Sequence, residues 1–185
     1  MAYTAELNII KELPHSEKIK GFCVVKHLIN MFPEFAFLVQ GGSSSYLHAL
    51  NEKNVEIELY DIDILVGSKD INTNNKIVNF ITNNYKNIKF KDEQSSIFYV
   101  YIGNDIILNF FINEATLEEI LSIKMVKVFG INIKPFNIVI EEERKMLENV
   151  SQDLEYCIKN NEPDEEIQYF KDKVRRKKEF LNLFN

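Results

Sequence analysis

The chain has 185 residues, 45% hydrophobic and 27% charged, a balance that favours one folded domain with a substantial core. Its formal net charge of −6 argues against tight nucleic-acid binding through overall charge alone, although a local basic patch remains compatible with it. The two cysteines, Cys23 and Cys157, have no zinc-ligand spacing and are predicted to be buried, reduced thiols.

The N-terminal segment contains no continuous apolar stretch of the signal-peptide type. No apolar run approaches the roughly 20 residues that a membrane-spanning helix needs. We therefore expect an intracellular, cytoplasmic protein with no membrane partner.

The first half of the chain alternates helical and strand patterns. Helices are expected where apolar residues recur at helical spacing, and strands where short apolar runs end at turn residues. The expected helices are 21–32, 43–54 and 72–85. The expected strands are 34–40 and 59–68. Ser43 or Ser44 is expected to be the N-cap of the second helix, since serine oxygen accepts hydrogen bonds from free helical N–H groups.

The second half begins with strand patterns and ends with helices. The strands are expected at 87–91, 96–103 and 105–113, with a hairpin turn at 103–105. Thr116 and Glu119 form a capping-box pattern at the start of a short helix, and a further hairpin is expected around Gly130. From residue 137 onward the pattern is helical.

These patterns predict an α/β (α+β) fold, in which a mixed sheet is flanked by helices and followed by a helical C-terminal part. We expect a core of residues 1–136 and a C-terminal helical segment of residues 137–185 that packs on the core.

Asp61 and Asp63 alternate with hydrophobic residues in the second strand. Alternation places both carboxylates on one face, about 7 Å apart along the strand. Unpaired, they would repel each other, and oxygen ligands suit a hard cation such as Mg²⁺. Two solvated aspartates on an edge strand are the alternative, but the apolar residues around them favour a central strand.

The junction between the first strand and the second helix carries Gly41, Gly42 and Ser43. Glycines permit close approach to the backbone, and a helix N-terminus attracts phosphate. The simpler alternative is a tight strand-to-helix turn capped by serine. Either motif alone is weak, and their order along the chain strengthens both.

Strand, Gly-Gly-Ser turn, helix and Asp-x-Asp strand together resemble the DNA polymerase β-like nucleotidyltransferase superfamily. The matching segments are LVQGGSSSYL (38–47) and YDIDILV (60–66), and the resemblance spans residues 34–113. It implies a nucleotidyltransferase fold that transfers a nucleoside monophosphate from a nucleoside triphosphate, with ATP favoured, to a hydroxyl group. The acceptor would be an RNA 3′ end, a protein or a small molecule.

The same resemblance implies roles for individual residues. Gly41, Gly42 and Ser43, with Ser44 as a substitute, would bind the triphosphate. Asp61 and Asp63 would ligate two Mg²⁺ (or Mn²⁺) ions.

Asn109 departs from the superfamily pattern, because the third acid is expected at its position. An amide oxygen can contact a metal ion but brings no negative charge. Asp92 or Glu93 could supply the missing acid, whereas Asp105 is about 13 Å from Asn109 along the strand. A polar residue satisfied by a neighbouring backbone group is the other explanation. The alternative function is therefore a catalytically inactive, nucleotidyltransferase-like regulatory or binding subunit, working with a protein partner or a second copy of itself.

Residues 127–150 and 171–184 are weakly similar to poly(A) polymerases of large DNA viruses and to abortive-infection nucleotidyltransferases. The basic stretch 171–178 has two explanations. It could contact RNA phosphates, or it could be the C-terminal part of a helix whose acidic start and basic end match the helix dipole. The second explanation is favoured, since charge on an exposed helix face is ordinary.

Overall fold

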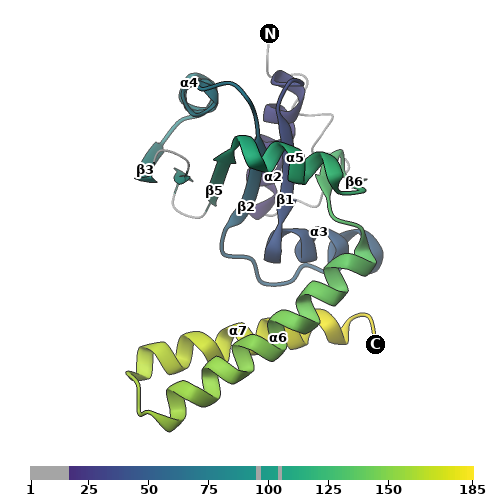
Figure 1. Ribbon diagram of the computed structural model, residues 1–185, viewed down its shortest axis with the longest axis vertical. Helices are drawn as coiled ribbons and strands as arrows, with labels where there is room; N and C mark the ends of the chain where they lie inside the picture. The colour runs from purple at the N-terminus through teal and green to yellow at the C-terminus, as the bar shows by residue number, and fades with distance from the viewer. Residues whose placement is uncertain (1–16, 95–96, 104–105) are drawn as a thin grey trace. The chain divides into compact units, whose positions relative to one another are not determined.

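The computed structural model describes residues 17–94, 97–103 and 106–185 (Figure 1). These residues form two compact units. The first consists of residues 17–44 and 59–134, and the second of residues 45–58 and 135–185. Within the described ranges, no helix is long and apolar enough to span a membrane.

The first unit is built on a mixed seven-stranded sheet whose strand order is β3-β4-β5-β2-β1-β7-β6. The strands are β1 (Ala36–Gln40), β2 (Ile62–Gly67), β3 (Ile88–Gln94), β4 (Ile97–Ile102), β5 (Ile106–Asn113), β6 (Val126–Val128) and β7 (Ile131–Ile133). The β2–β5 and β1–β7 pairs are parallel, and the other neighbours are antiparallel. The prediction of a mixed sheet flanked by helices is confirmed, and β2 lies at its centre.

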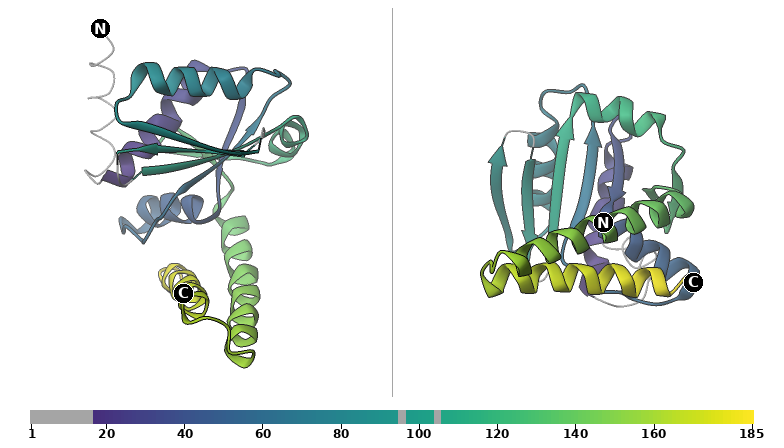
Figure 2. Two further views of the ribbon diagram at one scale, coloured as in Figure 1. Left: turned by 90° about the vertical axis from the view of Figure 1, so that its left-hand side faces the viewer. Right: turned by 60° about the horizontal axis from the view of Figure 1, so that its bottom comes forward.

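Alternation along the strands places one row of side chains in the core. The hydrophobic residues of β2, β4 and β5 that this alternation buries are Ile62, Ile64, Val66, Phe98, Val100, Leu108 and Phe110. Among the described residues of this unit, the helices are α2 (Glu17–Met31), α4 (Thr73–Asn84), α5 (Glu114–Ser122) and the first turn of α3 (Gly41–Lys53). Figure 2 shows the sheet almost edge-on in its left view, with α4 along one face.

Helix α5 packs closely against the end of β2. A Cβ atom built on Gly67 would lie 2.3 Å from the Cα of Leu117, so only glycine fits at this contact. Because Gly67 and Asp63 are an even number of residues apart on one strand, they share a face of the sheet. Helix α5 therefore closes one end of the face that carries Asp63.

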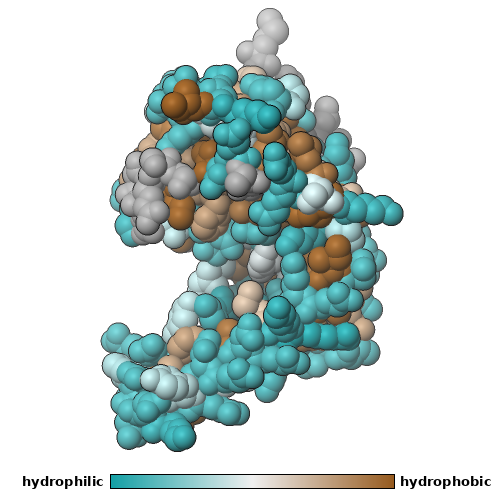
Figure 3. All heavy atoms as spheres, in the orientation of Figure 1, coloured by the Kyte–Doolittle hydropathy of each residue, from teal (hydrophilic) through white to brown (hydrophobic). Residues whose placement is uncertain are grey.

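The second unit contains the end of α3 (Gly41–Lys53), together with α6 (Phe136–Lys159) and α7 (Asp164–Asn182). Its core consists of buried Ala49, Val139, Phe180 and Leu181, against which other aromatic and aliphatic side chains pack. Its visible surface is predominantly hydrophilic (Figure 3). The predicted C-terminal helices are thus present. The unit also includes residues 45–58, which the sequence places in the core of 1–136.

Both predictions of helix caps are wrong. Helix α3 begins at Gly41, so Ser43 and Ser44 lie inside its first turn. Helix α5 begins at Glu114, ahead of the expected cap at Thr116. In each case the chain enters the helix directly from the preceding strand, β1 or β5, with no loop that could hold a capping residue.

The other local predictions need smaller changes. The β4–β5 and β6–β7 hairpins are confirmed by their antiparallel pairing, although residues 104–105 of the first turn lie outside the described residues. Both cysteines are free thiols, and Cys157 is buried as expected, but Cys23 is partly exposed.

Candidate functional site

The glycine turn lies against the acidic strand. Strand β1 ends at Gln40, and Gly41 starts α3 with a φ of 60°. This is the left-handed region, which glycine adopts without the strain of a side chain. A Cβ atom at Gly41 would lie 3.1 Å from Oδ2 of Asp63, whereas one at Gly42 would have no neighbour within 4 Å. Gly41 therefore brings the turn close to a carboxylate, and Gly42 faces open space.

Ser43 joins this turn to the start of β2. Its Oγ donates a hydrogen bond to the backbone oxygen of Asp61, at 3.1 Å, and accepts one from the backbone N–H of Asp63, also at 3.1 Å. The side chain is fully buried. The hydroxyl that was expected at a phosphate thus has two main-chain partners here, and it fixes the backbone that carries the two acids.

Ser44, the second serine of the motif, is also buried. Its hydroxyl has no hydrogen-bond partner within the part of the chain that the structure describes. The phosphate contacts expected for both serines stay predictions.

Asn109 lies beside Asp63 on the neighbouring parallel strand, β5. Its Nδ2 donates a hydrogen bond of 3.0 Å to Oδ1 of Asp63. Asn109 is only 5% exposed, and its Oδ1 has no hydrogen-bond partner among the described residues. A buried amide oxygen without a partner costs free energy, and a cation ligated there would remove that cost.

The charges at this place are poorly compensated. Burial and the negative charge of Asp61 raise the pKa of Asp63 to about 6, while the hydrogen bond from Asn109 lowers it. Asp61 itself precedes the first residue of β2. Two neighbouring carboxylates, one of them largely desolvated, form an oxygen-rich environment that a hard cation would stabilise.

The donor set is small. Within the described residues, no group of three or more His, Cys, Asp or Glu side chains could hold a metal ion. The side chains of Asp92 and Glu93, the expected substitutes for a third acid, lie outside what the structure describes, as does Asp105, which the strand spacing sets aside. The residues that fit a cation are therefore Asp61 and Asp63, with the amide oxygen of Asn109.

A row of side chains crosses the sheet through this site. Direct strand partners place Gln40 of β1 next to Asp63, and Asn109 next to Tyr99 of β4. Lys91 of β3 follows, because it pairs with Tyr99. Sequence reasoning missed Gln40, Tyr99 and Lys91, since the strand alternation is visible in the sequence but the register between strands is not.

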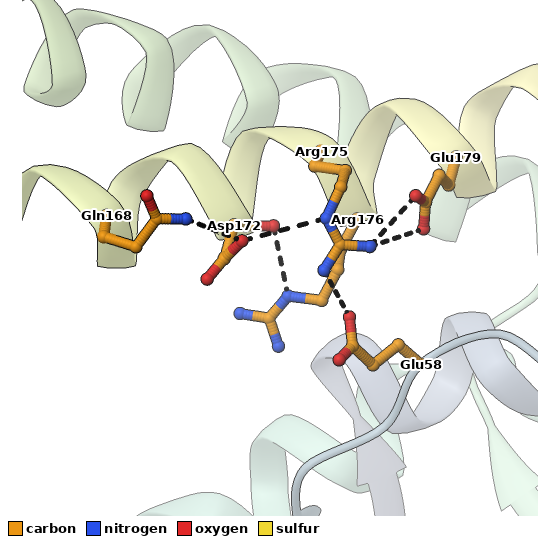
Figure 4. A network of polar contacts seen from close by, with 6 residues as sticks. All are labelled: Glu58, Gln168, Asp172, Arg175, Arg176 and Glu179. Atoms are coloured by element: carbon orange, nitrogen blue, oxygen red, sulfur yellow. Dashed lines mark hydrogen bonds and ion pairs between the residues drawn. The ribbon is translucent and has the colours of Figure 1, made fainter.

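The basic stretch of α7 is engaged within the second unit. Arg175 contacts Glu58 at 2.6 Å and Glu179 at 3.0 Å (Figure 4). Lys177 contacts the buried Glu143 at 2.7 Å. The first turn of α7 contains three acidic residues. The acidic first turn agrees with the helix-charge explanation, but the last turn of α7 holds no basic residue, because the stretch 171–178 lies in the middle of the helix. The ion pairs of Arg175 and Lys177 weigh against the RNA-contact explanation.

Comparison with known proteins finds no matching family model and no matching curated protein. Among solved structures, the chain is similar to the Megavirus polyadenylate synthase, with a TM-score of 0.49 and 12% sequence identity. The match covers 71% of this chain and 26% of the viral one. At this level of similarity, the match assigns neither a family nor an activity to the chain.

Proposed function

We propose that this protein is a nucleotidyltransferase that transfers a nucleoside monophosphate from a nucleoside triphosphate, with ATP favoured, to a hydroxyl group. The observation that carries the proposal is the contact between the glycine turn and the acidic strand. Gly41 leaves room for Oδ2 of Asp63 at a place where any side chain would crowd it. The turn that would bind phosphate therefore adjoins an acid that would bind a cation, within the first unit.

Each residue has a defined part in the proposal. The first turn of α3, at Gly41 and Gly42, would bind the triphosphate through backbone N–H groups. Asp61 and Asp63 would hold Mg²⁺ or Mn²⁺, with the amide of Asn109 as a neutral neighbour. A divalent cation bound there supplies charge neutralisation for the transferring phosphoryl group. Ser43 positions the acids through their backbone.

The reaction is an in-line displacement at the α-phosphorus. The acceptor oxygen bonds to that phosphorus, the bond to the leaving pyrophosphate breaks, and the hydroxyl proton passes to solvent. The contribution of the protein is to align the two ends of the displacement and to compensate charge between them.

Asn109 supports a second candidate function, that of a catalytically inactive binding or regulatory subunit. Its amide donates to Asp63, where a third carboxylate would instead add negative charge. Asn109→Asp distinguishes the candidates. If the wild-type protein turns over Mg·ATP, the inactive candidate is refuted. If only Asn109→Asp gains turnover and tighter Mn²⁺ binding, the inactive candidate is supported.

Calorimetric titration with a non-hydrolysable ATP analogue and Mg²⁺ or Mn²⁺ tests the shared binding site. We expect saturable binding by the wild-type chain, and at least tenfold weaker binding when Asp61→Asn and Asp63→Asn are combined. Asp153→Asn with Glu155→Gln removes the same charge from an exposed part of α6 and is the matched control. Equal affinities for the wild-type protein and the acid-pair variant would refute the proposal.

A further inference from the structure

The face of the sheet that carries Asp63 and Asn109 continues into two tyrosine–lysine pairs. Tyr99 is the direct strand partner of both Asn109 and Lys91, and Tyr101 is the partner of Lys89. Directly paired residues project from the same face, as do residues two apart on one strand. All four side chains therefore lie on the same face of the sheet as the candidate site, on strands β3 and β4.

These side chains combine planar rings with positive charge. Both tyrosines are half-buried, and both lysines are exposed. Lys91 Nζ lies 5.7 Å from the centroid of the Tyr99 ring, so the charge stays over the ring. We call Lys89, Lys91, Tyr99 and Tyr101 the tyrosine–lysine face. It contrasts with the net charge of −6 of the whole chain, because it gathers two cations on the same face of the sheet as the acidic site.

The proposed reaction fixes the side from which an acceptor approaches. The triphosphate would lie at the start of α3, which follows β1, and the acids lie on β2. In an in-line displacement the attacking and leaving oxygens lie on opposite sides of the phosphorus. The acceptor hydroxyl must therefore come from the β5, β4 and β3 side. With neighbouring strands about 4.8 Å apart, β4 and β3 are roughly 10 and 14 Å from β2.

We propose that the tyrosine–lysine face binds a single-stranded nucleic acid and presents its terminal hydroxyl to the acidic pair. This inference rests on the proposed function and names the acceptor class. Tyrosine rings stack on bases of any sequence, and lysines neutralise the backbone phosphates between them. A sugar or protein hydroxyl would need neither a stacking surface nor paired cations at this distance from the acids. The spacing of two tyrosines on alternate residues fits two successive nucleotides.

Fluorescence anisotropy with the full chain and a labelled single-stranded oligoadenylate RNA tests the inference, in the absence of nucleotide and divalent cation. We expect Lys89→Gln with Lys91→Gln to weaken binding at least tenfold. The slope of log K against log salt should fall by about 1.4, because each phosphate that a lysine no longer neutralises accounts for about 0.7. Lys145→Gln with Lys159→Gln on α6 removes equal charge and should leave the affinity within twofold of wild type.

The tyrosines are tested by a pair of substitutions. Tyr99→Leu with Tyr101→Leu should weaken binding by tenfold or more, because stacking is removed. Tyr99→Phe with Tyr101→Phe keeps the rings and should retain affinity within about threefold, which separates stacking from loss of folding. Tyr156→Leu, at an exposed tyrosine of α6, is the control and should have no effect.

Several outcomes would overturn the inference. They are the absence of wild-type binding, equal losses of affinity in the α6 control variants, or tighter binding of duplex RNA than of the single strand.

Single-stranded DNA of the same length then shows whether the face contacts the 2′-hydroxyl group. Asp61→Asn with Asp63→Asn should keep oligonucleotide binding while losing the ATP analogue. If the acid substitutions weaken nucleotide binding but substitutions in the tyrosine–lysine face leave oligonucleotide binding unchanged, only the acceptor inference fails. If substitutions in the tyrosine–lysine face weaken oligonucleotide binding but the acid substitutions leave nucleotide binding unchanged, the proposed transferase function fails.

Discussion

At the scale of single residues, the two adjacent glycines of the turn differ in what they require. Gly41 has a φ of 60°, and a Cβ atom there would meet Asp63, whereas Gly42 has open space around it. The sequence presents them as equivalent, because positive φ and close approach are properties of the folded backbone. Only one of the two therefore needs to be glycine for the fold.

We expect Gly41→Ala to lower the free energy of unfolding by about 1–2 kcal/mol, the cost of a left-handed residue with a side chain. The matched substitution, Gly42→Ala, should change it by less than about 1 kcal/mol, since alanine favours a helix and meets no neighbour. Chemical denaturation of the two variants measures the difference. Equal destabilisation by both would contradict the stated role of Gly41.

The raised pKa of Asp63 makes the stability of the chain depend on pH. Its pKa is about 6 in the folded chain, compared with 3.8 for an ordinary aspartate, because of burial and the charge of Asp61. The folded state therefore holds a proton that the unfolded state releases, and stability falls as the pH rises through this interval. Above about pH 6 the ionised carboxylate carries the full penalty, about 3 kcal/mol at most.

Asp63→Asn removes this penalty and keeps an acceptor for the amide of Asn109. We expect the variant to be more stable than the wild-type chain at about pH 7.5, and the gain to disappear near pH 4. Urea denaturation across this range measures it. Asp153→Asn on an exposed turn of α6 controls for the removal of one negative charge. A wild-type chain that gains stability relative to Asp63→Asn as the pH rises would show that the carboxylate is well compensated.

At the scale of elements, one buried charge ties three helices of the second unit together. Glu143 of α6 accepts a hydrogen bond of 2.8 Å from Ser45 of α3, and contacts Lys177 of α7 at 2.7 Å. Its side chain is 7% exposed, and that of Lys177 is 18% exposed. The Arg175 contacts, in contrast, are at least one-third exposed on both sides. Burial therefore decides which of these ion pairs matters for stability.

Lys177→Met should cost about 3–5 kcal/mol, because it leaves Glu143 charged and buried without its cation. Arg175→Gln should cost no more than about 1 kcal/mol, since exposed ion pairs contribute little. Thermal and chemical denaturation compare the two. Combining Lys177→Met with Glu143→Leu should recover part of the loss. Equal costs for Lys177→Met and Arg175→Gln would rule out a special role for the buried carboxylate.

At the scale of the whole molecule, the order of the strands predicts a gradient of local stability. Strand β2 lies at the centre of the sheet, between β1 and β5, and β5 lies between β2 and β4. Strand β6 has three residues and lies at the edge. We expect hydrogen exchange to be slowest in β1, β2 and β5, through global unfolding, and much faster in β6, through local opening. Exchange in β2 as fast as in β6 would contradict the assigned strand order.

The sequence predicts most of the elements of this molecule and less of how they join. Apolar periodicity identified strands and helices and placed Asp63 on a central strand, whereas Asp61 lies just before that strand. The resemblance to the superfamily, rather than periodicity, predicted Asn109 at the place of the third acid. The starts of α3 and α5 were missed, because a hydroxyl residue near the start of a helix suggests a cap, whereas both helices begin directly after a strand and Ser43 instead bridges to β2. The Tyr99 and Lys91 neighbours were missed because the register between β3, β4 and β5 cannot be read from the alternation, although these strands follow one another in the chain.

The contact between Gly67 and α5 has a consequence for the proposed substrate. It closes the acidic face at one end, so an acceptor chain would extend outward over β4 and past the β3 edge. Each nucleotide added at the terminal hydroxyl would then displace the earlier nucleotides of the acceptor away from α5 rather than toward it. Repeated additions, with the product sliding by one step each time, would meet no obstruction from the sheet itself.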